Sequence, residues 1–175
     1  MAEIFVTSDT FFGRENIIKH AKRDYQSVEE MNDDLVERWN ETVDSKDTVY
    51  HLGNFAWDPF SAIVLHKLNG KIVFLNGTYD KALKDVVKNC KRAELYMGQI
   101  LEIPNLNLVM CHYPLAHWNG KDTGTLHLHG HTYDKFPHDV DSGRINVCID
   151  CWNLSPVSIT TLHDLIEDYR KFNKQ

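Results

Sequence analysis

The chain has 175 residues, of which 42% are hydrophobic and 25% are charged, as is ordinary for one globular domain spanning residues 1–175. Its net charge of −6 argues against broad nucleic-acid binding, because such binding depends on clustered lysine and arginine. No apolar run is long enough to cross a bilayer, and residues 2–8 lack the features of a signal peptide, so we expect a cytoplasmic protein without a membrane partner.

Strands are predicted at three places in the first half of the chain. Residues 3–8, 48–52 and 71–75 are rich in β-branched and aromatic residues, and each run ends in a loop. Helical patterns follow all three runs. Strands that alternate with helices predict a parallel or mixed sheet.

The helices of this half are predicted from their capping residues. The first follows a capping pattern and has apolar residues four positions apart, at Met31, Leu35 and Trp39. A second helix begins after an Asp-Pro pair and ends near residue 68, and a third ends near residue 90. The three predicted caps are Ser27, Asp58 and Asp80.

The second half of the chain has a different pattern. Short runs at residues 93–96, 99–103 and 106–110 are separated by turn residues and predict a β meander. Further strands are predicted at residues 125–129, 144–151 and 157–160, followed by an amphipathic helix at about residues 162–172. This order predicts an α/β fold of two stacked sheets flanked by helices.

The cysteines are too few and too unevenly spaced to predict a disulfide scaffold. Cys148 and Cys151 have the two-residue spacing of half a zinc site, but no second cysteine pair accompanies them. Within a strand their side chains would lie on opposite faces. We therefore interpret the spacing as coincidental.

The segment at residues 126–133 contains three histidines at alternating positions. In a strand, Leu126 and Leu128 would point into the core, and His127 and His129 would point to the opposite face. A row of imidazoles that ends at a glycine and His131 fits a metal-binding edge, because histidine is a common ligand of divalent metals. The alternative is that each histidine is an ordinary hydrogen-bonded strand residue.

Loops that follow predicted strands carry a set of chemically distinctive residues in a fixed order. These loops contain Asp9 and Phe11, Gly53-Asn54, Gly77-Thr78-Tyr79-Asp80, His112, and His129-Gly130-His131-Thr132-Tyr133. Their order and setting resemble the calcineurin-like metallophosphoesterases, particularly the small bacterial and phage members of that superfamily. The resemblance covers nearly the whole chain and implies a four-layer α/β/β/α sandwich of two mixed sheets flanked by helices.

In that superfamily the corresponding residues bind two divalent metals, which activate a water and hold the phosphate oxygens. The resemblance gives Asp9, His112 and His131 as matching ligands. The other positions differ: Phe11 and Tyr133 stand in place of ligand histidines, Asn54 in place of the bridging aspartate, Thr78 in place of the ligand asparagine, and Tyr79 in place of the histidine that assists the leaving group.

These differences change what the site is expected to bind. Phe11 has no donor atom, and Asn54 offers a neutral amide where two dications need a shared negative charge. We expect no cofactor, or at most one weakly bound Zn, Mn or Ni ion held by His112 and His131, with Asn54 and Thr78 as poor donors. The phenol of Tyr79 is a poor proton donor near neutral pH.

Two functions remain open. The first is a non-catalytic relative of the phosphoesterases that binds an unknown protein partner or a phosphorylated ligand. The second is a residual one-metal phosphodiesterase or phosphatase that uses Asp9, His112 and His131. In the first, a group of aromatic residues either forms a contact surface or fills the volume of the lost metals: Phe11, Phe12, Phe55, Trp57 and Tyr79. The candidate donors to an anion are Arg14, Lys81, His112, His129 and His131.

Overall fold

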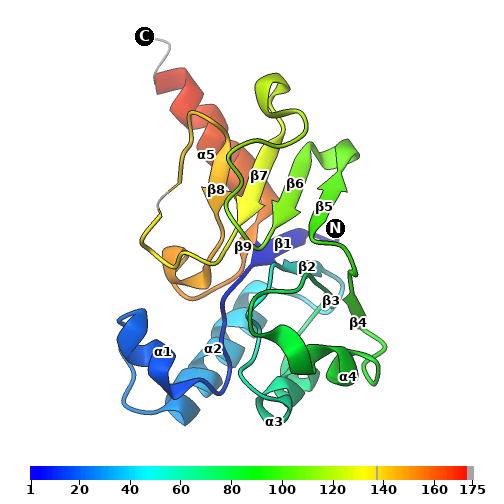
Figure 1. Cartoon of the computed structure of the whole chain (residues 1–175), viewed down its shortest axis with the longest axis vertical. Coiled ribbons are helices and arrows are strands. Elements are labelled where there is room, and N and C mark those ends of the chain that lie inside the picture. Colours follow the sequence, from blue (N-terminus) through cyan, green and yellow to red (C-terminus); the bar gives the residue numbers. More distant parts are fainter. Residues whose placement is uncertain (137, 173–175) are drawn as a thin grey trace.

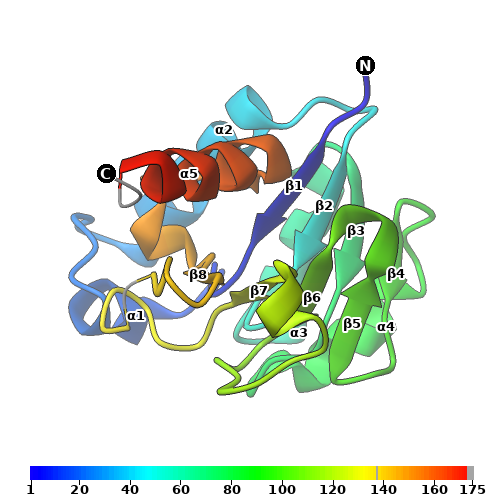
Figure 2. The same ribbon diagram turned by 90° about the horizontal axis from the view of Figure 1, so that it is seen from above.

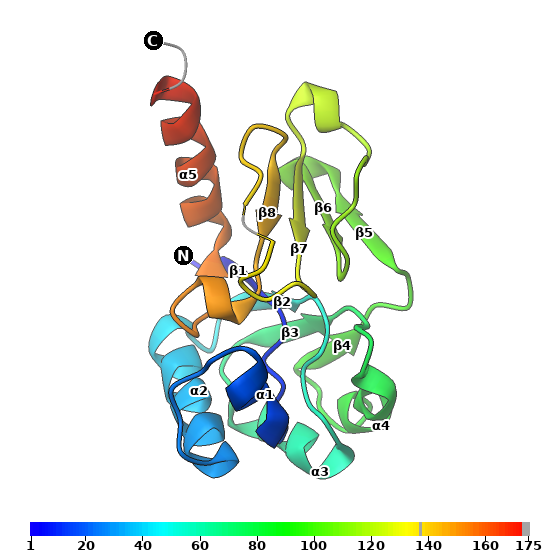
Figure 3. The ribbon, with the colours of Figure 1, turned by 60° about the vertical axis from the view of Figure 1, so that its left-hand side comes forward.

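The computed structural model describes residues 1–136 and 138–172 (Figure 1). Two mixed sheets pack against each other and are flanked by helices, which confirms the predicted α/β architecture (Figure 3). Among the described residues, every helix is too short or too polar to cross a membrane.

The first sheet is built from the strand–loop–helix units of the first half. Its strand order is β4-β3-β2-β1-β9; β1 to β4 are parallel and β9 is antiparallel to β1. Figure 2 shows β1 to β4 side by side. These strands are β1 (Ile4–Thr7), β2 (Thr48–His51), β3 (Lys71–Phe74), β4 (Ala93–Leu95) and β9 (Val157–Ser158).

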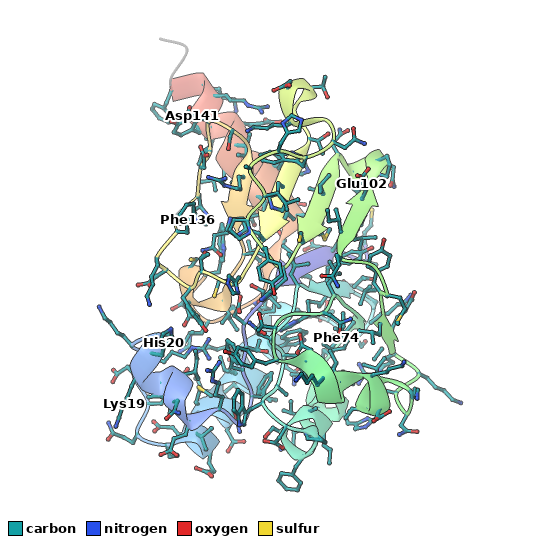
Figure 4. The ribbon with its side chains drawn as sticks, in the orientation of Figure 1. Lys19, His20, Phe74, Glu102, Phe136 and Asp141 are labelled. Atoms are coloured by element: carbon teal, nitrogen blue, oxygen red, sulfur yellow. The ribbon has the colours of Figure 1, made fainter. Side chains whose placement is uncertain are left out.

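Helices cover the face of the first sheet that lies away from the second sheet (Figure 3). Their apolar residues form one core with the inner residues of β1 to β3, among them Phe74, which is labelled in Figure 4. Burial of Met31, Leu35 and Trp39 confirms the predicted periodicity. The helices are α1 (Glu15–His20), α2 (Val28–Thr42), α3 (Pro59–Ala62) and α4 (Leu83–Val87), with 3₁₀ turns at Ile63–Lys67 and Asp80–Ala82.

Two of the predicted helix caps are confirmed. The side chain of Ser27 accepts a hydrogen bond from the N–H of Glu30 at 3.1 Å, and that of Asp58 accepts one from Ser61 at 2.9 Å. The prediction for Asp80 is wrong, because its carboxylate accepts the N–H groups of Asn54, Phe55 and Gly77 and does not cap its own turn.

The second sheet has the strand order β5-β6-β7-β8, with β5 antiparallel to β6 and the others parallel. Its apolar face forms a second core with Val6, Leu52 and Leu75 of the first sheet and with the last helix, α5. These elements are β5 (Ile100–Ile103), β6 (Leu108–Cys111), β7 (Leu126–His129), β8 (Arg144–Asn146) and α5 (Ile159–Phe172), with 3₁₀ turns at Pro104–Leu106, Lys121–Thr123 and Ile149–Cys151.

Two strand predictions need correction. The predicted meander is wrong for β4, which pairs in parallel with β3 in the first sheet, whereas β5 and β6 do pair as neighbours. The strand predicted at residues 144–151 ends at Asn146, because the Asn146 side chain accepts the N–H of Cys148 at 2.9 Å and turns the chain. Cys148 consequently precedes a 3₁₀ turn and Cys151 is its last residue, so the two do not lie in one strand.

Candidate functional site

Strand ends from both sheets meet at one place. Asp9 follows β1, Asn54 follows β2, Thr78 follows β3, His112 follows β6, and His131 follows β7. Hydrogen bonds join them directly or through the residue next in the chain. The polar residues predicted to form one site are therefore brought together.

The side-chain amide of Asn54 lies at the centre of this cluster. Its Nδ2 donates a hydrogen bond to Oδ1 of Asp9 at 2.8 Å and lies 3.2 Å from Nε2 of His112. Its Oδ1 accepts the N–H of Tyr79 at 3.1 Å, which identifies the oxygen of the amide. The two hydrogens of the amide therefore bridge a carboxylate and an imidazole.

Two contacts fix the orientation of the His112 ring. Its Nδ1 lies 2.7 Å from the carbonyl oxygen of Leu52, so Nδ1 carries the proton and donates it. The other nitrogen, Nε2, is left as an acceptor for the amide of Asn54. His112 is buried, and both of its ring nitrogens have a partner.

The carboxylate of Asp9 is buried and has a full set of donors. Oδ2 accepts the hydroxyl of Ser8 at 2.7 Å and the N–H of His131 at 2.8 Å, in addition to the Asn54 bond at Oδ1. Glycine at position 130 permits this approach, because a Cβ there would lie 2.5 Å from Oδ2 of Asp9. The negative charge of Asp9 is thus stabilised by protein groups alone.

His131 forms the exposed edge of the cluster. Its ring centroid lies 5.1 Å from that of His112 and 4.8 Å from that of Tyr113. Partial burial and the neighbouring His112 lower the pKa of His131, and Asp9 opposes them. Thr78 is also exposed, and its hydroxyl lies 3.1 Å from the hydroxyl of Tyr113.

The aromatic residues divide into a buried group and an exposed group. Phe11, Phe12 and Phe55 are almost fully buried, so they fill the core as one of the two interpretations predicted. Trp57 and Tyr79 are 48% and 40% exposed and form part of the surface.

Tyr133 lines the same region from the loop after β7. Its ring stacks on that of Phe11 at 6.1 Å and meets the ring of His20 of α1, labelled in Figure 4, at 5.0 Å. Burial and the charge of Asp9 raise the pKa of Tyr133 to about 12. Its phenol is therefore neutral at physiological pH.

The backbone at these positions is strained. Asp9, Phe11, Asn54, His131 and Tyr133 all have left-handed φ angles between 52° and 70°. Such angles are costly for residues other than glycine, of the order of 1–3 kcal/mol each, and they concentrate at functional sites.

The donor set does not fit a two-metal centre. The point between Asp9 and His112 is taken by amide N–H groups, which cannot coordinate a cation, and Phe11 contributes no donor. Among the described residues, no three His, Cys, Asp or Glu side chains are grouped closely enough to hold a metal ion.

Asp80 supports the site in a way that sequence reasoning missed. Its carboxylate accepts the N–H groups of Asn54, Phe55 and Gly77 at 2.6–2.9 Å, which ties the loop after β2 to the loop after β3. Burial raises the pKa of Asp80, and these three bonds oppose the shift. Its place in the Gly77–Asp80 motif was the available signal.

Arg23 is a second supporting residue that was missed. Its guanidinium donates to the carbonyl oxygens of Asp9 and Thr10 at 2.7 and 2.8 Å, and it forms a buried two-point ion pair with Asp150 at 2.8 and 3.0 Å. Burial lowers the pKa of Arg23, but the bond and charge of Asp150 outweigh it. No local pattern marks a pair separated by 127 residues.

The remaining candidate donors lie apart from this surface. His127 and His129 are buried under loops, and their rings stack at 5.6 Å. Nδ1 of His129 lies 3.0 Å from the carbonyl oxygen of Gly130, and burial lowers the pKa of His129 to about 4. Lys81 is exposed on the turn before α4.

Comparison with known proteins gives one curated relative and two solved structures. No family model matches the chain. The chain is 32% identical over 176 residues to the uncharacterized protein MJ1445 of Methanocaldococcus jannaschii. The aligned region covers 95% of this chain and 93% of that protein.

The two solved structures share the fold. A protein of unknown function, AQ665 from Aquifex aeolicus, superposes with a TM-score of 0.73 at 20% identity, over 94% of this chain and 100% of that one. An archaeal phosphodiesterase superposes with a TM-score of 0.50 at 20% identity, over 82% of each chain. The chain thus shares its fold with both proteins, one of which is described as a phosphodiesterase.

Proposed function

We propose that this chain, which belongs to the same protein family as MJ1445 of Methanocaldococcus jannaschii, is a non-catalytic protein of phosphoesterase-like fold that acts by binding. One observation carries the proposal. The amide of Asn54 donates to both Asp9 and His112 at the centre of the cluster, so the protein itself satisfies the groups that a metal would need.

Hydrolysis of a phosphate ester by two metals requires a negative bridge between the ions and open coordination positions for water. Here the bridging position carries a neutral amide whose hydrogens face its partners. Displacing that amide would break both bonds in a buried setting, at roughly 1–3 kcal/mol for each group left unpaired. Binding without turnover therefore agrees best with the hydrogen-bond arrangement.

A phosphorylated small molecule is the ligand that we favour. The exposed imidazole of His131 and the hydroxyl of Thr78 face solvent beside the cluster. The guanidinium of Arg14 lies nearby, in contact with Phe11 and Tyr79. Imidazole, hydroxyl and guanidinium groups all donate hydrogen bonds to phosphate oxygens.

A protein partner is the second candidate. Trp57, Tyr79 and Phe60 expose large rings, and Phe60 is 84% exposed. Exposed aromatic residues are enriched at protein interfaces. Recovery of a defined complex at a fixed stoichiometry, abolished by Phe60→Ser, would favour this candidate over the small molecule.

The proposal is tested by measuring metal content and hydrolysis together. Purified protein is analysed for bound metals and then assayed on a chromogenic phosphodiester with manganese, zinc or nickel. We expect no turnover above that of His112→Ala, the matched control for contaminating enzymes. Turnover that requires His112 would refute the proposal and support the one-metal phosphodiesterase with Asp9, His112 and His131.

Ligand binding is tested separately by thermal shift. Phosphorylated compounds at about 10 mM are expected to raise the melting temperature, because a ligand of the folded state stabilises it. No shift with any of them would eliminate the small-molecule form of the proposal.

A further inference from the structure

Arg14 lies inside a cage of three aromatic rings. Its guanidinium carbon is 4.5 Å from the ring centroid of Phe11, 4.7 Å from that of Trp57 and 4.6 Å from that of Tyr79. All three distances are within the range of attraction between a cation and an aromatic face. Trp57 and Tyr79 also contact each other at 5.4 Å, so the cage is closed on that side.

The guanidinium of Arg14 has no counter-ion in the part of the chain that the structure describes. Among residues 1–136 and 138–172, its side chain has no ion pair and no hydrogen bond, and its Nη1 is buried without a partner. Three other arginines are paired with carboxylates, Arg23 with Asp150, Arg38 with Asp34 and Arg144 with Asp139, and Arg92 donates to the carbonyl oxygens of Leu68 and Gly70. A desolvated donor without a partner is costly, and the aromatic faces offset part of that cost.

The cage opens beside the cluster of strand-end residues. Phe11 stacks on Tyr133, which lies two residues after His131. The guanidinium of Arg14 lies over the rings of Trp57 and Tyr79, and these residues remain 48% and 40% exposed. An uncompensated cation and exposed flat rings are therefore neighbours on one surface.

This pairing matches a ligand that carries both an anion and an aromatic group. A planar guanidinium binds two phosphate oxygens at once, and a nucleobase stacks on an exposed tryptophan or tyrosine ring. We propose that the Arg14 cage is the recognition site for a nucleotide, with the phosphate on Arg14 and the base against Trp57 or Tyr79. The inference rests on the non-catalytic binding role proposed above.

The test uses isothermal titration of the full chain with AMP, ribose 5-phosphate, adenosine and inorganic phosphate. We expect AMP to bind most tightly. Arg14→Gln should weaken AMP by about tenfold or more, which is the loss of one charged hydrogen-bond pair. Trp57→Ala should weaken AMP and adenosine by a larger factor than ribose 5-phosphate.

Two further variants keep the test decisive. Arg14→Lys preserves the cation in the cage but not its two-pronged geometry, so it should fold like the wild type and bind AMP with intermediate affinity. Lys81→Gln removes one positive charge from an exposed position on the turn before α4, outside the cage, and should leave AMP affinity unchanged. Equal weakening by Lys81→Gln would show a general charge effect and overturn the assignment to Arg14.

The outcomes separate this inference from the proposed function. AMP binding that survives Arg14→Gln but is lost in His131→Ala refutes the cage and leaves the binding role intact. Equal affinity for AMP and ribose 5-phosphate refutes the stacking of the base. Hydrolysis of the phosphodiester that depends on His112 refutes the proposed function whatever the effect of Arg14.

Discussion

Replacing Asn54 by aspartate tests the central hydrogen-bond arrangement. The change is nearly isosteric, but it exchanges a donor for an acceptor at a buried position. The new carboxylate oxygen would stand where Nδ2 now lies, 2.8 Å from Oδ1 of Asp9 and 3.2 Å from Nε2 of His112. Two favourable contacts become repulsive ones.

The size of the effect follows from two routes by which the protein can accommodate the second carboxylate. Keeping both carboxylates charged about 3 Å apart costs about 5 kcal/mol at an effective dielectric constant near 20. Binding one proton between them at pH 7 costs about 4 kcal/mol, because an ordinary carboxyl titrates near pH 4. The second route is cheaper, so we expect a loss of about 4 kcal/mol, or roughly 10 °C in melting temperature.

The stability of the Asn54→Asp protein should also depend on pH in a defined direction. The pair in the folded Asn54→Asp protein holds a proton above the ordinary carboxyl pKa, so stability should fall as the pH rises from 4 to 7. Urea unfolding at several pH values measures this loss, and Asn54→Ala serves as the uncharged control with a weaker pH dependence. Manganese or zinc should restabilise Asn54→Asp and leave the wild type unchanged. An Asn54→Asp protein as stable as the wild type at pH 7 without metal would contradict the reasoning.

Three further measurements probe the supporting structure. Burial lowers the pKa of His51 to about 3, whereas an unfolded histidine protonates near pH 6.5. The free energy of unfolding should therefore drop by about 2 kcal/mol between pH 7 and pH 5. Urea titrations of His51→Asn should show a pH dependence that is smaller by this amount. Arg23→Met should cost about 3–5 kcal/mol by leaving Asp150 buried and unpaired, whereas Asp85→Asn in an exposed ion pair should change stability by less than about 1 kcal/mol. Gly130→Ala should lower the melting temperature, because the added Cβ would lie 2.1 Å from the hydroxyl oxygen of Ser8. An unchanged melting temperature would refute that steric requirement.

Local patterns in the sequence were sufficient for most of the fold. Periodic apolar residues and caps identified α2 and the start of α3, because these signals depend on neighbours three or four positions apart. They gave no information on partners of strands, so β4 was placed in a meander although it pairs with β3. Strand pairing is decided by the return of the chain after α4, which no short pattern encodes.

The sequence was sufficient to predict which residues form the candidate site, but not how their side chains interact. Asp9, Asn54, Thr78, His112 and His131 were expected together because the resemblance to the metallophosphoesterases assigns them to one site, and each follows a strand. The orientation of the Asn54 amide depends on the N–H of Tyr79, 25 residues away. The aromatic cage of Arg14 likewise depends on side chains from three separate loops.

The strained backbone links these observations. Phe11 and Tyr133 keep left-handed φ angles of 52°, although Phe11 has no donor atom for a metal and a bulky side chain is disfavoured at such angles. Relaxing either angle would displace the stacked pair of rings and open the cage around Arg14, since Phe11 belongs to both. The same turns that place Asp9 and His131 around Asn54 therefore also hold the aromatic rings against the unpaired guanidinium. A ligand that binds Arg14 would gain from geometry that the fold already maintains.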